Sequence, residues 1–173
     1  MIDDTGSVTF RADLATGGEG MYLADGERVR TIVETGDTFS SLGLFPIRNN
    51  AGIVAFCASL RAGGSGVFVA YEGEIETIVD TSSSFESFRG VLLDGAGRIV
   101  FYATARGGTL GVFSGHDPIA NCLFSLGSPL FGSTVAEFAL NPVSINDAGQ
   151  IAIRVTLTDR RQFILRSDPP EAA

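Results

Sequence analysis

The sequence has no lysine, no tryptophan, one histidine and two cysteines. It has no apolar run near the roughly 20 residues of a membrane-spanning helix, so membrane insertion is not expected. Its first residues, MIDDTGSV, lack the basic segment and the apolar core of a signal peptide. The chain also shows no Ser–His–Asp arrangement, no zinc-ligand spacing and no phosphate-binding glycine loop. We therefore expect no cofactor and no enzymatic activity.

Acidic side chains outnumber basic ones, 20 to 12, and the net charge is −8. Nucleic acids and anionic membranes attract basic surfaces, so neither is an expected partner. Hydrophobic residues make up 45% and charged residues 18% of the 173 residues, which is typical of a folded protein. This length favours one hydrophobic core, and we interpret residues 1–173 as a single repeat domain.

The sequence contains four similar segments. Each begins with a polar turn that holds one glycine, which we call the anchoring glycine. In the first three repeats a second glycine follows at a matching offset. The anchoring glycines are Gly6, Gly52, Gly97 and Gly149, and the second glycines are Gly20, Gly66 and Gly111. The predicted repeats cover about residues 1–48, 49–93, 94–144 and 145–173.

Apolar residues occupy alternate positions after each anchoring glycine. A period of two predicts a β-strand with one buried face. The residues that follow predict a glycine-rich hairpin loop, a second strand, another tight turn and a third strand. The predicted core contains Val8, Phe10, Val54, Phe56, Ile99, Phe101, Ile151 and Ile153.

A fourth strand is predicted before each of the three later anchoring glycines, at GLFPIR, RGVLL and PVSI. No part of the chain shows sustained helical periodicity. Four strands in about 46 residues is the size of one propeller blade. We therefore predict an all-β fold of antiparallel four-strand repeats, arranged as a β-propeller with about four blades per chain and with incomplete terminal blades.

The stretch NNAGIVAF, residues 49–56, resembles the N-x-x-G-x-x-A-F signature of a family of bacterial tandem-repeat proteins. The stretches DDTGSVTF, DGAGRIVF and NDAGQIAI are degenerate versions of the same signature. The resemblance covers nearly the whole chain. It implies a β-propeller-like surface protein. Since members of the family are often exported and carry varied C-terminal anchors, it also implies an extracellular or cell-surface location.

Asn49 and Asn50 begin the second anchoring turn. Asx side chains bond to the backbone two residues on, and the glycine supplies the left-handed conformation that closes the turn. Calcium is the alternative, because it binds clustered carboxylate and carbonyl oxygens. The second turn has no acid and the third has one, so we favour a structural turn over a metal site. The equivalent residues are Asp3 and Asp4, Asp94 and Gly95, and Asn146 and Asp147.

His116, in the stretch SGHDPI, could act as a general base that Asp117 orients. It falls at a hairpin tip, where two other repeats have Asp25-Gly26 and Glu72-Gly73. Adjacent residues rarely orient one another's rings for catalysis. We therefore interpret His116 as an exposed turn residue.

The two cysteines, Cys57 and Cys122, belong to different repeats. Cys57 lies in a first strand after an anchoring glycine and Cys122 in a third strand. A disulfide needs Cα atoms within about 7 Å of each other, which this placement does not favour. We predict two free thiols.

Propeller enzymes usually work near the central axis, where acids, asparagines or histidines of the innermost strands surround a metal. The innermost strands here supply Arg48, Arg89 and Asn141, without a carboxylate or a histidine. A metal-dependent hydrolase or lactonase is therefore not favoured. A carbohydrate-binding propeller stays open as an alternative. Sugar sites usually stack their ligand on aromatic rings, and the candidate rings besides phenylalanine are Tyr22, Tyr71 and Tyr102.

Because folding explains every recurring residue, we predict a non-catalytic interaction or structural module that binds itself or another protein through surface loops. The third repeat has extra length between Cys122 and Asn146. Insertions in repeat proteins form surface loops and often binding faces. We expect a specific partner to contact the region from His116 to Asn141.

The two ends of the repeat array are incomplete. The first blade lacks the strand before its anchoring glycine, and the fourth lacks the third strand after its own, which predicts blades of three, four, four and three strands. Unpaired sheet edges are templates for pairing with another chain. Either the ends meet in a four-bladed ring, or copies associate end to end as a closed dimer or a filament. Four blades is the small extreme for a propeller, so we favour self-association.

Overall fold

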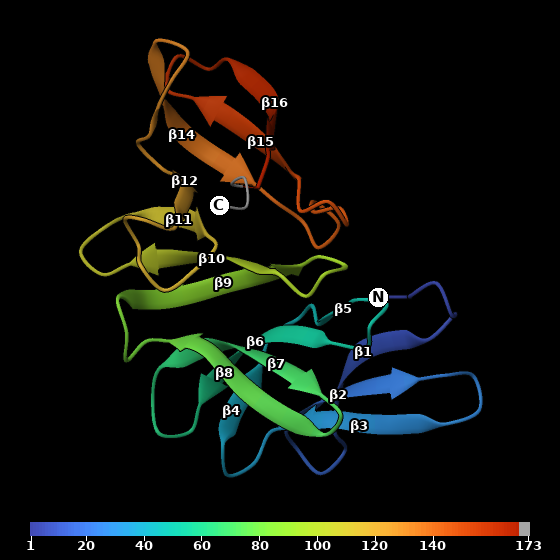
Figure 1. Cartoon of the computed structure of the whole chain (residues 1–173). Coiled ribbons are helices and arrows are strands. Elements are labelled where there is room, and N and C mark those ends of the chain that lie inside the picture. Colours follow the sequence, from blue (N-terminus) through green and yellow to red (C-terminus); the bar gives the residue numbers. More distant parts are fainter. Residues whose placement is uncertain (170–173) are drawn as a thin grey trace.

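In the computed structural model, which describes residues 1–169, the regular structure consists of sixteen β-strands and no helix (Figure 1). The all-β prediction is therefore confirmed. No described helix could span a membrane. Every strand pairing is antiparallel, and the strands form four sheets of three to five strands, which we number I to IV along the chain.

The sheets use the strands in chain order. Sheet I contains β1 (Val8–Asp13), β2 (Glu19–Ala24) and β3 (Val29–Glu34). Sheet II contains β4 (Phe39–Leu42), β5 (Ile47–Arg48), β6 (Val54–Leu60), β7 (Ser65–Tyr71) and β8 (Glu74–Asp80). Sheet III contains β9 (Phe85–Leu93), β10 (Ile99–Ala105), β11 (Leu110–Phe113) and β12 (Cys122–Ser125). Sheet IV contains β13 (Pro129–Leu130), β14 (Ser133–Ala139), β15 (Ile151–Leu157) and β16 (Gln162–Ser167).

The strand before each anchoring turn joins the sheet of the repeat that follows it. The sheets hold three, five, four and four strands rather than three, four, four and three. Sheet II gains a strand because its first strand is broken into β4 and β5, and Pro46, which has no N–H group, stands directly before β5. Sheet IV gains β13, which turns back into β14 at Phe131 and Gly132, both with positive φ.

The prediction of a strand at PVSI is wrong. The first long strand of sheet IV is β14, which ends at Ala139, and the stretch from Pro142 to Ser144 lies outside the sheet. Only Ile145 makes an isolated bridge, to Ile151. Proline cannot donate a ladder hydrogen bond, so Pro142 disfavours a strand at this point.

The repeats share one register. Phe10 pairs with Tyr22, Phe56 with Phe68, Phe101 with Phe113 and Ile153 with Leu165, each from the first to the second strand after an anchoring glycine. We call the face of each sheet that carries these pairs the front face and the opposite face the back face. Figure 1 shows the four sheets following one another from the N-terminal sheet, in blue, to the C-terminal sheet, in red.

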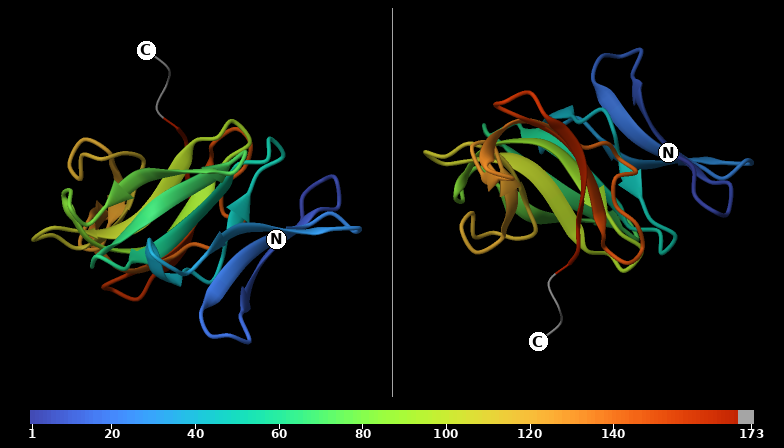
Figure 2. Two further views of the ribbon diagram at one scale, coloured as in Figure 1. Left: turned by 90° about the horizontal axis from the view of Figure 1, so that it is seen from below. Right: turned by 90° about the horizontal axis from the view of Figure 1, so that it is seen from above.

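Each front face packs on the back face of the preceding sheet. One hydrophobic cluster joins Met21 and Val33 of sheet I to Phe56 and its neighbours in sheet II. A second joins the back face of sheet II to the front face of sheet III, and a third joins sheets III and IV in the same way. Within residues 1–169, sheets II and III are therefore buried on both faces, whereas sheets I and IV each keep one face without a neighbouring sheet (Figure 2).

Most of the predicted core is confirmed, and the exceptions have one main cause. Five of the eight predicted residues are buried, namely Val54, Phe56, Phe101, Ile151 and Ile153. Phe10 and Ile99 are half-buried. The prediction for Val8 is wrong, since it is 37% exposed. Val8 and Phe10 lie on the front face of sheet I, where no preceding sheet covers them.

Candidate functional site

The anchoring turns have the same geometry in all four repeats. The first Asx side chain of each turn accepts a hydrogen bond from the backbone N–H four residues later, and the anchoring glycine has a φ between 74° and 88°. Three of the four side chains also accept the N–H two residues on. The structural interpretation of these turns is therefore confirmed. The Asx residues are Asp3, Asn49, Asp94 and Asn146.

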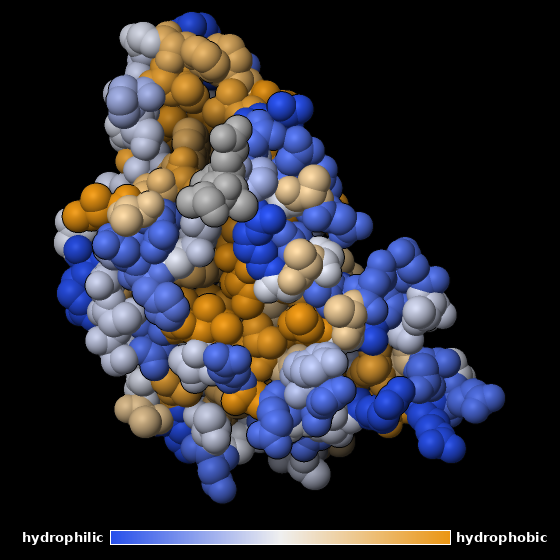
Figure 3. Space-filling view, in the orientation of Figure 1, coloured by the Kyte–Doolittle hydropathy of each residue, from blue (hydrophilic) through white to orange (hydrophobic). Residues whose placement is uncertain are grey.

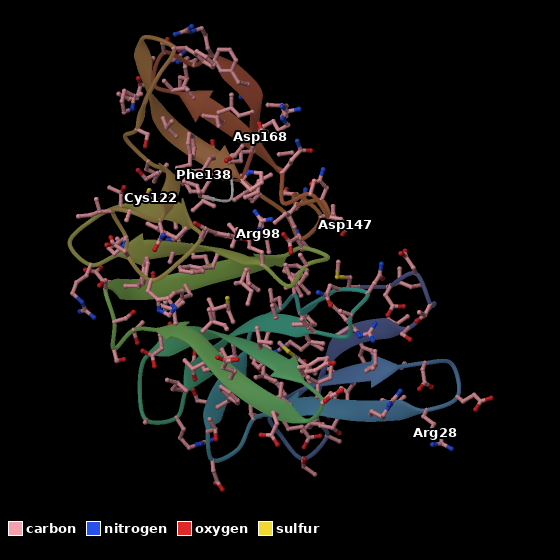
Figure 4. The ribbon with its side chains drawn as sticks, viewed as in Figure 1. Arg28, Arg98, Cys122, Phe138, Asp147 and Asp168 are labelled. Atoms are coloured by element: carbon pink, nitrogen blue, oxygen red, sulfur yellow. The ribbon has the colours of Figure 1, made fainter. Side chains whose placement is uncertain are left out.

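Consecutive turns also contact one another. The Asn50 Nδ2 donates to Asp4 Oδ2 at 2.6 Å, which links the first two turns. The buried Asn49 Nδ2 donates to the backbone oxygen of Asp94 at 3.1 Å, which links the second and third. Arg98 and Asp147, of the third and fourth turns, lie on the same side of the molecule (Figure 4). The turns thus join neighbouring sheets as well as neighbouring strands.

The Asx carboxylates of the first and third turns lie against arginine side chains. Asp3 forms an ion pair with Arg48, and Asp94 Oδ2 lies 3.2 Å from Arg98 Nε. Among residues 1–169, no three His, Cys, Asp or Glu side chains are grouped for a metal ion. The turns act as structural elements that hold the sheets together.

His116 is exposed, as is Asp117 beside it. The Asp117 carboxylate accepts the backbone N–H groups of Ile119 and Ala120 at 2.8 and 3.0 Å. These bonds hold the pKa of Asp117 below its usual range. Asp117 therefore orders its own loop rather than the His116 ring, and the pair has no catalytic geometry.

The cysteines are both free thiols and lie on different strands, Cys57 on β6 and Cys122 on β12. Both pack at the edge of the cluster between sheets II and III. Burial raises the pKa of the Cys57 thiol to about 12, so it is protonated at neutral pH. A protonated thiol is a poor nucleophile, which gives Cys57 a packing role.

One cavity lies where the first strands of sheets II, III and IV leave their ladders. It has a volume of about 360 Å³, and we call it the Arg89 cavity. Its lining residues are Gly43, Leu44, Phe45, Cys57, Arg89, Gly90, Val91, Leu92, Tyr102, Leu140, Asn141 and Pro142.

Three backbone irregularities build this cavity. In sheet II, Leu42 pairs with Ala58 and Ile47 with Ala55, so residues 43–46 bulge out of the ladder. In sheet III, Gly90 pairs with Tyr102 and Phe88 with Ala103, so Arg89 is an extra residue in a β-bulge. In sheet IV, residues 140–144 leave the ladder after Ala139. Bulges redirect side chains and are common at functional sites.

A second cavity, of about 350 Å³, adjoins the first through Leu44, Phe45 and Pro142 and extends to Met1 and Phe10 of the N-terminal segment. Leu44 and Phe45 are each 67% exposed. In the space-filling view, hydrophobic side chains reach the surface in the middle of the molecule (Figure 3). The walls are thus mainly apolar and open to solvent.

The sequence-derived candidates divide between two places. Arg89 and Asn141 both line the Arg89 cavity, whereas Arg48 lies away from it, ion-paired with Asp3. The sequence interpretation missed Leu44 and Phe45, which supply the apolar wall. Pro46 and Pro142, each inside an apparent strand, are the signals that could have indicated these ladder breaks.

The extra length of the third repeat forms ordinary elements rather than one long loop. It contains β13, the turn at Phe131 and β14. Ile119 and Phe131 are exposed, at 89% and 57%. The expectation that a partner contacts residues 116–141 stays a prediction.

Comparison with protein-family models, curated proteins and solved structures gives no match for this chain.

Proposed function

We propose that the chain is a non-catalytic structural module whose copies associate end to end through sheets I and IV, with the sheets arranged as blades of a β-propeller. The observation that carries the proposal is a pair of uncovered faces. The front face of sheet I repeats the apolar pattern that the internal interfaces bury, and Ile164 on the otherwise largely polar back face of sheet IV occupies a register position that the other three sheets bury. The tandem repeat itself supports a structural role, since neighbouring repeats in such arrays bury each other's faces.

The front face of sheet I carries the apolar pattern of a buried face. Its Phe10 and Tyr22 rings lie 5.7 Å apart, the same separation as the Phe56 and Phe68 rings. In sheet II the back face of sheet I covers that pair. On sheet I no preceding sheet is present, and Val29 at its edge is 64% exposed. The front face of sheet I therefore has the apolar residues of a sheet-to-sheet interface, but no second sheet packs on it within residues 1–169.

The back face of sheet IV is its counterpart. Register equates Ile164 with Met21, Val67 and Val112, because each of the four pairs with the residue that follows Phe10, Phe56, Phe101 or Ile153. Met21, Val67 and Val112 are 0% exposed, whereas Ile164 is 74% exposed. An isoleucine at this register position belongs to the pattern of a covered face.

The two faces are complementary in kind, because a front face packs on a back face at all three internal interfaces. Stacking sheet I of one copy on sheet IV of another repeats that contact. Such a contact is heterologous, so it closes a ring or extends into a filament. Two chains of four sheets would place about eight blades in a ring, within the usual range for propellers.

Light scattering across a wide concentration range tests the proposal. We expect the mass to rise from 18.1 kDa to a multiple of it, and Ile164→Glu to keep the chain monomeric. Ile119→Glu is the matched variant, because Ile119 is also exposed but lies in the 116–141 region. Loss of association with Ile119→Glu alone would place the contact on that loop and contradict the proposal.

A further inference from the structure

We propose that the Arg89 cavity binds a small aliphatic carboxylate, with the carboxylate on the Arg89 guanidinium and the hydrocarbon chain against Leu44 and Phe45. Three sheets contribute to this cavity at the points where their first strands leave the ladder. The cavity volume of about 360 Å³ is in the range of small-molecule sites. This inference goes beyond self-association, since the residues of one chain line the whole cavity.

The charge in the cavity favours an anion. Arg89 is the one charged residue among the lining residues. Its guanidinium has no carboxylate partner and donates no hydrogen bond within residues 1–169, while seven other arginines form ion pairs. A guanidinium offers five N–H donors in a planar fork that matches a carboxylate. Arg89 is exposed and lines the same cavity as the apolar residues Leu44 and Phe45.

The other polar groups of the cavity are neutral. Burial raises the pKa values of both Tyr102 and Cys57, so neither becomes an anion at neutral pH. The Asn141 side-chain oxygen already accepts the Val143 N–H. No lining side chain therefore competes with a ligand carboxylate for Arg89. A neutral ligand would gain no charge-assisted hydrogen bond from the exposed Arg89, so an amphipathic anion fits the site better.

The apolar walls of the cavity favour a hydrocarbon chain as the other part of the ligand. Leu44, Phe45, Leu140 and Pro142 present aliphatic and aromatic surface without a charged group. Removing a hydrocarbon chain from water against such surface is favourable by roughly 25 cal/mol for each Å² buried. A ligand with one carboxylate and an unbranched chain satisfies both parts of the cavity.

Titration with octanoate tests this inference by calorimetry and by backbone-amide NMR on the full chain. We expect one binding site, with shifts centred on residues 43–46 and 89–92. Octanol, which has the same chain and no charge, should bind more weakly. Because charge-assisted hydrogen bonds are lost, Arg89→Gln should weaken octanoate binding about tenfold or more.

Arg28→Gln is the control, because Arg28 is an exposed arginine with no described ion pair, does not line the cavity and lies in the turn between β2 and β3 (Figure 4). It should leave octanoate binding unchanged. Phe45→Glu, which adds a carboxylate to the wall, should abolish binding while the melting temperature stays near that of the original chain. Absence of octanoate binding at millimolar concentration, equal binding by Arg89→Gln, or equal binding of octanol would overturn the inference. None of these outcomes depends on self-association.

Discussion

The Phe56–Phe68 pair of sheet II and the Phe10–Tyr22 pair of sheet I have the same ring separation, 5.7 Å, but different surroundings. Phe56 and Phe68 are 0% and 2% exposed, and the Phe39 ring packs edge-on against both. Phe10 is only half-buried, and among residues 1–169 no third ring packs against its pair with Tyr22. The local sequence thus forms the aromatic pair, while a neighbouring sheet buries the pair in the core.

Truncating the two phenylalanines measures that difference. Phe56→Ala leaves a cavity in a closed cluster, so we expect a loss of about 3–5 kcal/mol in the free energy of unfolding. Phe10→Ala removes a ring that water already reaches, so at dilute, monomeric concentration we expect about 1–2 kcal/mol. Urea denaturation at matched concentrations measures both. Equal losses would show that sheet I is as closed as sheet II.

The anchoring turns offer a second matched pair. Asn49 is 7% exposed and links its own turn to the backbone of Asp94. Asn146 makes similar bonds within its turn but is exposed. Asn49→Ala leaves buried groups without partners, so we expect a cost of about 2–3 kcal/mol, against about 1 kcal/mol for Asn146→Ala. Denaturation midpoints of the two variants measure these losses. A larger loss of stability for Asn146→Ala than for Asn49→Ala would contradict the linking role of Asn49.

The sequence was sufficient for features that depend on neighbouring residues. Alternation after each anchoring glycine predicted the strands, and the Asx-glycine pattern predicted the turns. It was insufficient where distant segments decide the outcome. Val8 has the same local pattern as Val54, yet it is exposed because no sheet precedes its own. The Arg89 cavity arises from three separate ladder breaks, and no single stretch shows that they converge.

Cys57 and Arg154 occupy equivalent back-face positions, one in an internal interface and the other at an open end. Because burial raises the pKa of Cys57 to about 12, we expect iodoacetamide at pH 8 to modify it about tenfold or more slowly in the folded chain than in urea. Peptide mapping by mass spectrometry measures the rate. Equal rates in the two states would contradict the raised pKa of the folded Cys57 thiol.

The raised pKa of Cys57 also makes the stability of the folded chain depend on pH. A raised thiol pKa means that the folded chain keeps its proton better than the unfolded chain does. The resulting stability is present below the ordinary thiol pKa, near 8.5, and is lost as the pH rises toward 12. Cys57→Ala should therefore lose less stability than the original chain between pH 8 and pH 10. If the free energy of unfolding changed with pH in the same way in both proteins, the raised pKa of Cys57 would be contradicted.

Mixing two blocked variants tests the end-to-end contact most directly. Ala12→Glu places a charge on the front face of sheet I, where the equivalent Ala58 and Ala103 are 4% and 0% exposed, and Ile164→Glu blocks the back face of sheet IV. By light scattering, we expect each variant alone to have the monomer mass of 18.1 kDa and the equimolar mixture to have twice that mass, from one intact front face on one intact back face. A mixture that remains monomeric, or either variant associating alone like the original chain, would contradict the contact.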